Sequence, residues 1–590
     1  MYHIENGLLY KDDVPVFAVG VSYYASYFPP KMPVKPEDDA YGQAALDIAD
    51  IKNTGFNIVR CAARGDFGLD EGGKVWINTP LIDYIVERCG IEGLAAAVRI
   101  NGYSMDLHGY EHIRMWDCND HEFSGSEGGF IPNCCFHKGV IADNDTSTQA
   151  FARHFASFAN VVGYQIYNEP CYQSTADYNP AAIAAYREQL VENGVLSRDE
   201  AETYDPPRDY MKKCDRPEEL QNYRLFLSRG MNRFLALTAE AAKKACPDKA
   251  VFTCGVNTPL MLDSVRRGYE HYEMAGCMDI VGISLYGKHR GKGYYETDRY
   301  LCGAESMAAA CNKHAWVIEY DASNRIDPSD IERETYHAVG CGFKGILYYQ
   351  WRVDADNEGG PEIGVLGLID YERKPRNLFA TAKAVTAMLN EIGTRLVASE
   401  RMRGKVGILY SPSANAHSYA YTDNIVITKD GRSSYRIITP IKRMEILTDI
   451  LTDRQIHADQ VCAWDLAKNA VGIETLFVPC LDGLTPDESD EIEYFARNHN
   501  VYICTEQNDV FIDYQTGESV TLCDCKLPRQ PIHTQADYEI GAFVTESSSE
   551  YIISLVNRRE DGSPVDNVVI LLREDIAANS MKAVMVTPYG

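Results

Sequence analysis

The chain has 590 residues, of which 45% are hydrophobic and 24% are charged, and its formal net charge is −28. This length exceeds that of one ordinary domain, so two or three domains are expected. The acidic balance repels phosphate backbones and anionic lipids, which argues against nucleic acid or a membrane surface as the main partner and leaves a neutral sugar compatible.

The amino terminus has no basic segment followed by an apolar run, so we expect no secretory signal and a cytoplasmic protein. No later stretch of the sequence reaches the roughly 18 uninterrupted apolar residues of a membrane span. The 18 cysteines are scattered along the chain, many of them in strand-like segments. They are expected to be mostly reduced core residues rather than a disulfide framework.

Short β-rich segments alternate with helix-length stretches from the start of the chain to about residue 390. Eight such segments are present: 16–24, 56–62, 94–100, 161–168, 251–257, 280–286, 316–320 and 345–351. This alternation predicts an α/β fold, a (β/α)8 TIM barrel, whose active site lies at the carboxyl ends of the strands. We assign this catalytic domain to residues 1–395. A polar insert over 104–144 is expected to be a loop over the barrel mouth.

A second unit begins near Gly404. Segments 405–411, 475–480 and 501–505 predict parallel strands, and 444–453 and 486–498 predict helices between them. The expected structure is a doubly wound α/β domain over residues 396–512. The unit contains no glycine-rich phosphate-binding sequence, so nucleotide binding is not supported. Cys480 follows a strand without the glycine pattern of a nucleophile elbow and is predicted to be a structural thiol, which argues against amidotransferase activity.

The last part of the chain predicts a small antiparallel β domain over residues 513–590. Its expected strands lie at 541–544, 551–556 and 568–572. No internal repeat or low-complexity segment is present.

Two strand ends carry the residues of greatest chemical interest. The apolar fourth strand ends abruptly in Asn168 and Glu169, and the seventh contains Glu319 near its end. Strands four and seven face each other across a barrel of this width. A retaining glycosidase needs one carboxylic acid and one carboxylate about 5 to 5.5 Å apart. Glu169 and Glu319 are therefore predicted to form a catalytic pair.

Here the sequence resembles the clan of (β/α)8 retaining glycosidases that place the acid/base in Asn-Glu after strand four and the nucleophile after strand seven. The resemblance implies that Glu169 is the acid/base and Glu319 the nucleophile. It also implies substrate-binding or supporting roles for four further residues: Asn168 at the sugar 2-hydroxyl, Arg60 and Tyr286 at the nucleophile, and Trp351 as the floor of the sugar site.

Within that clan the sequence is most similar to glycoside hydrolase family 42, whose members are mostly β-galactosidases. The likeness is carried by Gly20-Val-Ser-Tyr-Tyr24, by the stretch from Asp47 to Arg60, and by Pro132-Asn-Cys-Cys135. That family appends an amidotransferase-like domain used for trimer formation and then a small β domain. The resemblance thus implies an exo-acting β-galactosidase that forms a homotrimer and takes an oligosaccharide or glycoside substrate.

Three alternatives remain open at this stage. A β-mannosidase or another clan member would use the same carboxylates. A non-catalytic carbohydrate-binding protein could keep the barrel, although nothing in folding requires both glutamates at the strand ends. Zinc could in principle bind Cys118, Cys134, Cys135 and His137, but their spacing is poor for a tetrahedral ion, so we expect no metal and no cofactor.

Overall fold

A computed structural model of the chain describes residues 1–24, 40–63, 65–100, 106–123, 133–172, 176–255, 265, 268, 270–286, 293–353, 364–427, 434–535, 540–559, 568–573 and 576. Eight parallel strands close into a barrel in the order β10-β11-β12-β13-β4-β5-β8-β9. They are β4 (Ala18–Ser22), β5 (Ile58–Ala62), β8 (Ala95–Arg99), β9 (Val161–Asn168), β10 (Ala250–Cys254), β11 (Ile280–Leu285), β12 (His314–Asp321) and β13 (Gly345–Tyr349). The predicted TIM barrel is thus confirmed. Residues 256 and 257, at the end of the expected fifth strand, lie outside the described residues.

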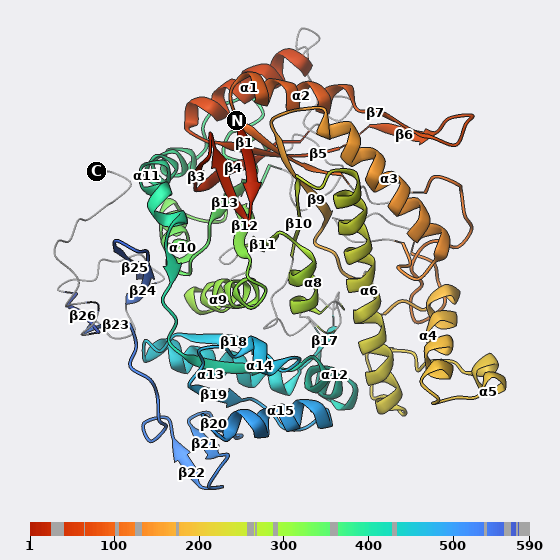
Figure 1. Cartoon of the computed structure of the whole chain (residues 1–590), viewed down its shortest axis with the longest axis vertical. Coiled ribbons are helices and arrows are strands. Elements are labelled where there is room, and N and C mark those ends of the chain that lie inside the picture. Colours follow the sequence, from red (N-terminus) through yellow and green to blue (C-terminus); the bar gives the residue numbers. More distant parts are fainter. Residues whose placement is uncertain are drawn as a thin grey trace.

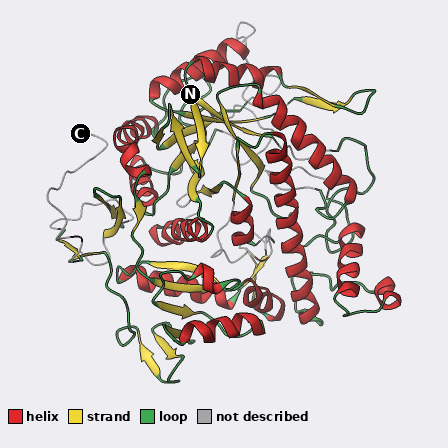
Figure 2. Cartoon of the chain, in the orientation of Figure 1, coloured by secondary structure: helices red, strands yellow, loops and turns green. Residues whose placement is uncertain are grey.

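Helices surround the barrel, as Figure 2 shows. Those that follow the strands are α1 (Ala40–Thr54), α2 (Pro80–Ile91), α3 (Lys138–Ala156), α6 (Pro217–Ala245), α8 (His271–Cys277), α9 (Tyr294–Ala310), α10 (Pro328–Gly340) and α11 (Phe379–Val397). Two shorter helices, α4 (Pro180–Glu192) and α5 (Arg198–Thr203), and a hairpin of β6 (Asp66–Leu69) and β7 (Val75–Asn78) extend the connections. The strands are buried on both faces, as a parallel sheet enclosed by helices requires.

The barrel interior holds its own apolar cluster, which combines small and large residues from alternate strands. Ala95, Ala97 and Ala250 make room for Phe252 and Trp316. The base of the barrel is closed by a three-stranded antiparallel sheet of β1 (Tyr2–Glu5), β2 (Leu8–Lys11) and β3 (Val14–Val16).

That N-terminal sheet belongs to the interior cluster through two side chains. Ile4 and Leu9 are buried among the residues of the barrel interior, and the indole Nε1 of Trp316 donates to the carbonyl of Gly7 at 2.9 Å. The apolar core therefore continues from the barrel into the sheet that closes its base.

The polar insert differs from the prediction at its end. Residues 138–144 begin helix α3, which His137 caps by accepting a hydrogen bond from the amide of Val140. The described part from 106 to 123 is loop with isolated bridges, and the buried Asp143 of α3 accepts hydrogen bonds from the backbone amides of Leu107 and His108. The expected loop is thus shorter than predicted because its last residues form an amphipathic helix.

The second unit contains a six-stranded sheet in the order β18-β15-β19-β20-β21-β22, in which the first four strands are parallel. Its strands are β15 (Val406–Tyr410), β18 (Ala458–Cys462), β19 (Thr475–Val478), β20 (Asn500–Cys504), β21 (Val510–Asp513) and β22 (Ser519–Thr521), and its helices are α12 (Pro412–Tyr421), α13 (Thr439–Asp453), α14 (Leu466–Asn469) and α15 (Pro486–Ala496). A short hairpin joins β16 (Ile425–Ile427) and β17 (Ser434–Arg436). The sheet continues to Thr521, past the boundary of 512 expected from the sequence.

The C-terminal strands form two small antiparallel sheets. One joins β14 (Glu400–Arg401), β24 (Ile540–Glu546) and β25 (Tyr551–Asn557), and the other pairs β23 (Ile532–Thr534) with β26 (Ile570–Leu572). Figure 1 shows the second unit, in cyan and blue, stacked below the barrel, where α12 packs on α6 and β18 on α9. No described helix is long and apolar enough to cross a membrane.

Candidate active site

The carboxyl ends of four barrel strands bring together most of the predicted site residues. Arg60 lies in β5, Asn168 ends β9 with Glu169 next to it, Glu319 lies in β12, and Tyr286 follows β11. Parallel strands of a barrel present their carboxyl ends at one face, so these side chains share the barrel mouth.

Arg60 is the centre of the buried network. Its guanidinium lies 2.8 Å from Oε1 of Glu319 and donates to Asn168 Oδ1 at 2.5 Å and to Gln165 Oε1 at 2.5 Å. A further hydrogen bond reaches the hydroxyl of Ser22 at 3.0 Å. Burial disfavours the charge, but the surrounding acidic groups outweigh burial and raise the pKa of Arg60, so that the guanidinium stays charged.

The side chain of Glu319 is only 6% exposed, and two residues hold its carboxyl group. Arg60 pairs with Oε1, and the phenol of Tyr286 donates to Oε2 at 3.0 Å. Burial and the nearby carboxylate raise the pKa of Tyr286 well above its usual value, so the phenol remains a donor. Both contacts fix the orientation of the carboxyl group.

Glu169 has a different environment. Its backbone is left-handed, with φ of +46°, and its amide donates to the carbonyl of Cys254 at 2.8 Å. A non-glycine residue in this conformation is uncommon and is held there by its surroundings. The hydroxyl of Ser284 donates to Oε1 of Glu169 at 2.7 Å. Ser284 thus gives Glu169 a hydrogen bond from a neutral hydroxyl, whereas Glu319 pairs with a cation.

Strand β11 connects the two carboxyl groups. Ser284 contacts Glu169, and Tyr286, two residues farther along, contacts Glu319. Tyr286 directly follows the strand, so both donors come from one segment of the barrel wall. The two glutamates therefore face one wall of the barrel mouth, as a pair that acts on one bond requires.

Comparison with known proteins shows which family this sequence and fold resemble. The sequence model of the family described as β-galactosidase, glycoside hydrolase family 42, matches residues 201–392, a segment that contains Glu319. The chain is glycoside hydrolase family 42-like. No curated protein matches it.

Solved structures with the same fold include β-galactosidases of low sequence identity to this family 42-like chain. The β-galactosidase of the Antarctic haloarchaeon Halorubrum lacusprofundi is 16% identical, with 88% of this chain and 85% of that chain covered and a TM-score of 0.64. That of Rahnella sp. R3 is 12% identical, covers 95% and 82%, and has a TM-score of 0.67. That of Bacillus circulans sp. alkalophilus is 15% identical, covers 83% and 71%, and has a TM-score of 0.65. These likenesses establish the fold.

Trp351 does not have the predicted position in this family 42-like barrel. Its side chain is 1% exposed and packs edge-on against Phe56 and against Phe379 of α11, with ring centroids 6.3 and 6.0 Å apart. A ring enclosed in this way has no free face for a sugar, so the prediction of a stacking platform is wrong. Tyr349, two residues earlier, lies beside Tyr24, with ring centroids 5.9 Å apart.

Sequence reasoning missed the polar residues that orient the site. Ser22, Gln165 and Ser284 are buried, and each donates to or accepts from a predicted site residue. Gln165 could have been found from the sequence, because it is a polar residue within the otherwise apolar strand β9.

The cysteines of the family 42-like chain are free thiols within the described residues. There, no group of three or more His, Cys, Asp or Glu side chains is arranged to hold a metal ion. Cys134 and Cys135 are buried and His137 caps α3. Burial raises the pKa of Cys480, in keeping with a structural thiol.

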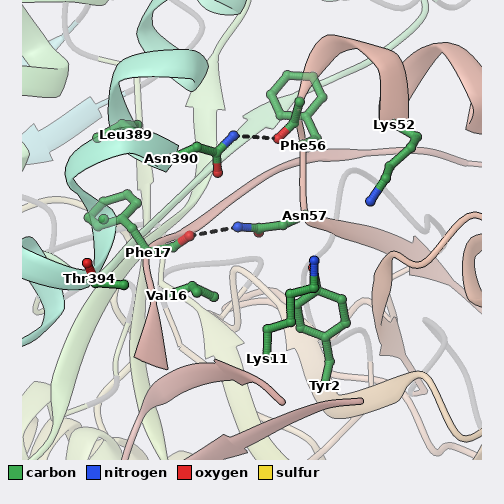
Figure 3. Close-up of a pocket in the computed structure, with 12 residues that line it drawn as sticks. Tyr2, Lys11, Val16, Phe17, Lys52, Phe56, Asn57, Leu389, Asn390 and Thr394 are labelled. Carbon is green, nitrogen blue, oxygen red and sulfur yellow. Dashed lines mark hydrogen bonds between the residues drawn. The ribbon is translucent and has the colours of Figure 1, made fainter. Parts of the chain in front are cut away.

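A cavity of about 280 Å³ lies at the opposite end of the barrel. Its lining includes Phe17 and Asn57, which precede β4 and β5, together with Lys11 and Lys52. Figure 3 shows the amino group of Lys52 pointing into the cavity on the side of Asn57. Neither glutamate of the pair lines this cavity, so it is separate from the candidate site at the barrel mouth.

Proposed function

We propose that the protein is a retaining exo-β-galactosidase in which Glu319 is the nucleophile and Glu169 the acid/base. The observation that carries the proposal is the contrast between the two carboxyl groups. Glu319 faces the guanidinium of Arg60 at 2.8 Å, and Glu169 is hydrogen-bonded by the neutral hydroxyl of Ser284. Two carboxyl groups in different environments are the arrangement that separates a nucleophile from a general acid.

The proposed reaction has two steps. Glu319 attacks the anomeric carbon while Glu169 transfers its proton to the glycosidic oxygen, and the leaving sugar departs. Glu169, now ionised, takes a proton from water as that water attacks the covalent glycosyl intermediate, so the anomeric configuration is retained. Arg60 and Tyr286 hold Glu319 in line for the attack.

Asn168 supports this assignment through the orientation of its amide. Its Oδ1 accepts hydrogen bonds from both Arg60 and Gln165. The amide nitrogen is therefore the group of Asn168 that would meet the sugar 2-hydroxyl. A galactoside is proposed because the matching family and the structural neighbours are β-galactosidases. A homotrimer and a cytoplasmic location stay predictions from the sequence.

The test is an assay of the purified protein on aryl β-galactoside, β-mannoside, β-glucoside and β-fucoside, with Glu169→Ala and Glu319→Ala. We expect turnover of the galactoside and losses of at least about 10³-fold in Glu319→Ala. Azide should restore Glu169→Ala by giving the β-glycosyl azide and restore Glu319→Ala by giving the α-azide. Exchanged products would reverse the two roles. Turnover of the mannoside alone would show that the substrate is a mannoside and not a galactoside. Tight sugar binding without turnover would favour a carbohydrate-binding protein.

A further inference from the structure

Two residues outside the predicted site form a chain of hydrogen bonds that ends on Glu169. Ser284, in β11, is 5% exposed and donates to Glu169 Oε1 at 2.7 Å. The thiol of Cys254, at the end of β10, lies 3.0 Å from the same Ser284 oxygen. Cys254 also accepts the amide hydrogen of Glu169 through its carbonyl. Both residues therefore hold the same glutamate, one through its side chain and one through its backbone.

The direction of each hydrogen bond follows from the number of protons available. A serine hydroxyl has one proton, and in this structure it points to Glu169. The contact between Cys254 and Ser284 must then be donated by the thiol. Burial and the charges of Glu319 and Glu169 raise the pKa of Cys254 well above its usual value, although Arg60 opposes this. The thiol thus keeps the proton that it donates.

We propose that Ser284, held by Cys254, is a positioning residue that occupies Oε1 of Glu169 and confines the transferable proton to Oε2. The proposal rests on the acid/base role of Glu169 given above. An oxygen that accepts a hydrogen bond in both protonation states cannot also present the acidic proton in that direction. The Ser284 contact therefore leaves one oxygen of Glu169 to serve both half-reactions.

This arrangement keeps the same atom in use throughout the cycle. Oε2 gives its proton to the leaving oxygen and later takes one from water, without a rotation of the carboxyl group between the steps. The left-handed backbone of Glu169 and its amide bond to Cys254 fix the residue from the other end. Ser284 touches neither of the reacting bonds and acts through Glu169.

The first experiment compares Ser284→Ala with Ser284→Thr, which keeps a hydroxyl, on two substrates. Methyl β-galactoside needs protonation of its leaving group, and 2,4-dinitrophenyl β-galactoside does not. In Ser284→Ala we expect kcat/KM to fall about 10- to 100-fold for the methyl glycoside and less than about threefold for the dinitrophenyl glycoside. Ser284→Thr should recover most of the loss. The matched control is Ser147→Ala, because Ser147 is buried in α3 and its hydroxyl donates to carbonyls of its own helix.

A second measurement needs no turnover. In protein labelled with ¹³C at the glutamate carboxyl carbons, the signal of Glu169 is identified by its loss in Glu169→Gln and followed against pH. The hydrogen bond from Ser284 is strongest to the ionised carboxylate, so Ser284→Ala should move the titration midpoint of Glu169 upward by about one pH unit, and Cys254→Ala by less.

Equal losses on both substrates together with an unchanged midpoint would overturn the positioning role. A wild-type protein that cleaves no glycoside, with a midpoint that still moves in Ser284→Ala, would overturn the proposed function and support the role of Ser284 in holding Glu169.

Discussion

Replacement of Arg60 by lysine tests the buried network at the barrel mouth. The substitution keeps a positive charge but replaces a planar group of five donors by a single ammonium on a flexible stem. Arg60 reaches Glu319 and Asn168 from one terminal nitrogen, at 2.8 and 2.5 Å, and reaches Gln165 from Nε at 2.5 Å. One ammonium cannot occupy these positions together, so we expect the lysine to keep Glu319 and to lose the two amide partners.

The size of the effect follows from the contacts that are lost. Hydrogen bonds to a charged group contribute about 1.5 to 3 kcal/mol each, and part of that loss is recovered by relaxation. We expect transition-state stabilisation to fall by about 2 to 4 kcal/mol, which corresponds to about 30- to 1000-fold in kcat/KM. Arg60→Met, which leaves Glu319 buried without a cation, should cost more and also destabilise the fold by about 3 to 5 kcal/mol.

The assay is kcat/KM on an aryl β-galactoside together with the thermal unfolding midpoint. Arg88→Lys is the control, because Arg88 pairs with Glu92 on the partly exposed helix α2, where such a pair contributes about 0.5 kcal/mol or less. If Arg60→Lys retains kcat/KM within about threefold of wild type, the geometry of the guanidinium is not what holds the nucleophile, and the reasoning fails.

Three further predictions concern stability. Burial lowers the pKa of His337, but Asp298 and a neighbouring thiol outweigh burial and raise it to about 9. Because this pKa exceeds the unfolded value of about 6.5, up to about 3 kcal/mol of stability should be present below pH 6.5 and be lost as pH rises through 9. His337→Gln should flatten this decline in thermal melts. Asp209 has a pKa of about 2 because two buried arginines outweigh its burial, so Asp209→Asn should lower the free energy of unfolding by about 3 to 5 kcal/mol in urea titrations, and a change below 1 kcal/mol would contradict this. A Cβ at Gly20 would meet a carbonyl oxygen of β5 at 2.1 Å, so Gly20→Ala should destabilise the barrel by at least about 3 kcal/mol, whereas Gly276→Ala, with nothing within 4 Å, should be neutral or stabilising in the same melt.

The barrel could be predicted because its strands are continuous apolar segments. The strand β18 could not, since residues 458–462 contain Asp459 and Gln460. Both are buried, Asp459 beside Arg401 and Arg403 and Gln460 against α9. Those partners are distant in sequence, so the pattern of residues 458–462 gave no sign of a strand. Strands β21 and β22 were likewise unforeseen, because they extend the parallel part of the sheet with antiparallel strands.

The predicted site shows a similar division. A residue's place at a strand end follows from the sequence, and this located Glu169, Glu319 and Arg60. The direction of a side chain does not, as Trp351 shows by packing toward Phe56 instead of the mouth. The contact between Ser284 and Glu169 depends on how neighbouring strands are aligned, and both β10 and β11 contain register shifts. Such shifts leave no mark in the composition of the strands.

The sheet that closes the base of the barrel has a consequence for synthesis. The carbonyl of Gly7 accepts a hydrogen bond from Trp316, which is 309 residues later in the chain. At a translation rate of roughly 5 to 20 residues per second, about 15 to 60 s pass between the appearance of the two residues. The apolar residues of β1 and β2 must therefore wait, unpaired with their final partners, until most of the barrel has left the ribosome. The first strands to be made are thus among the last to dock, and chaperone binding during translation should centre on them.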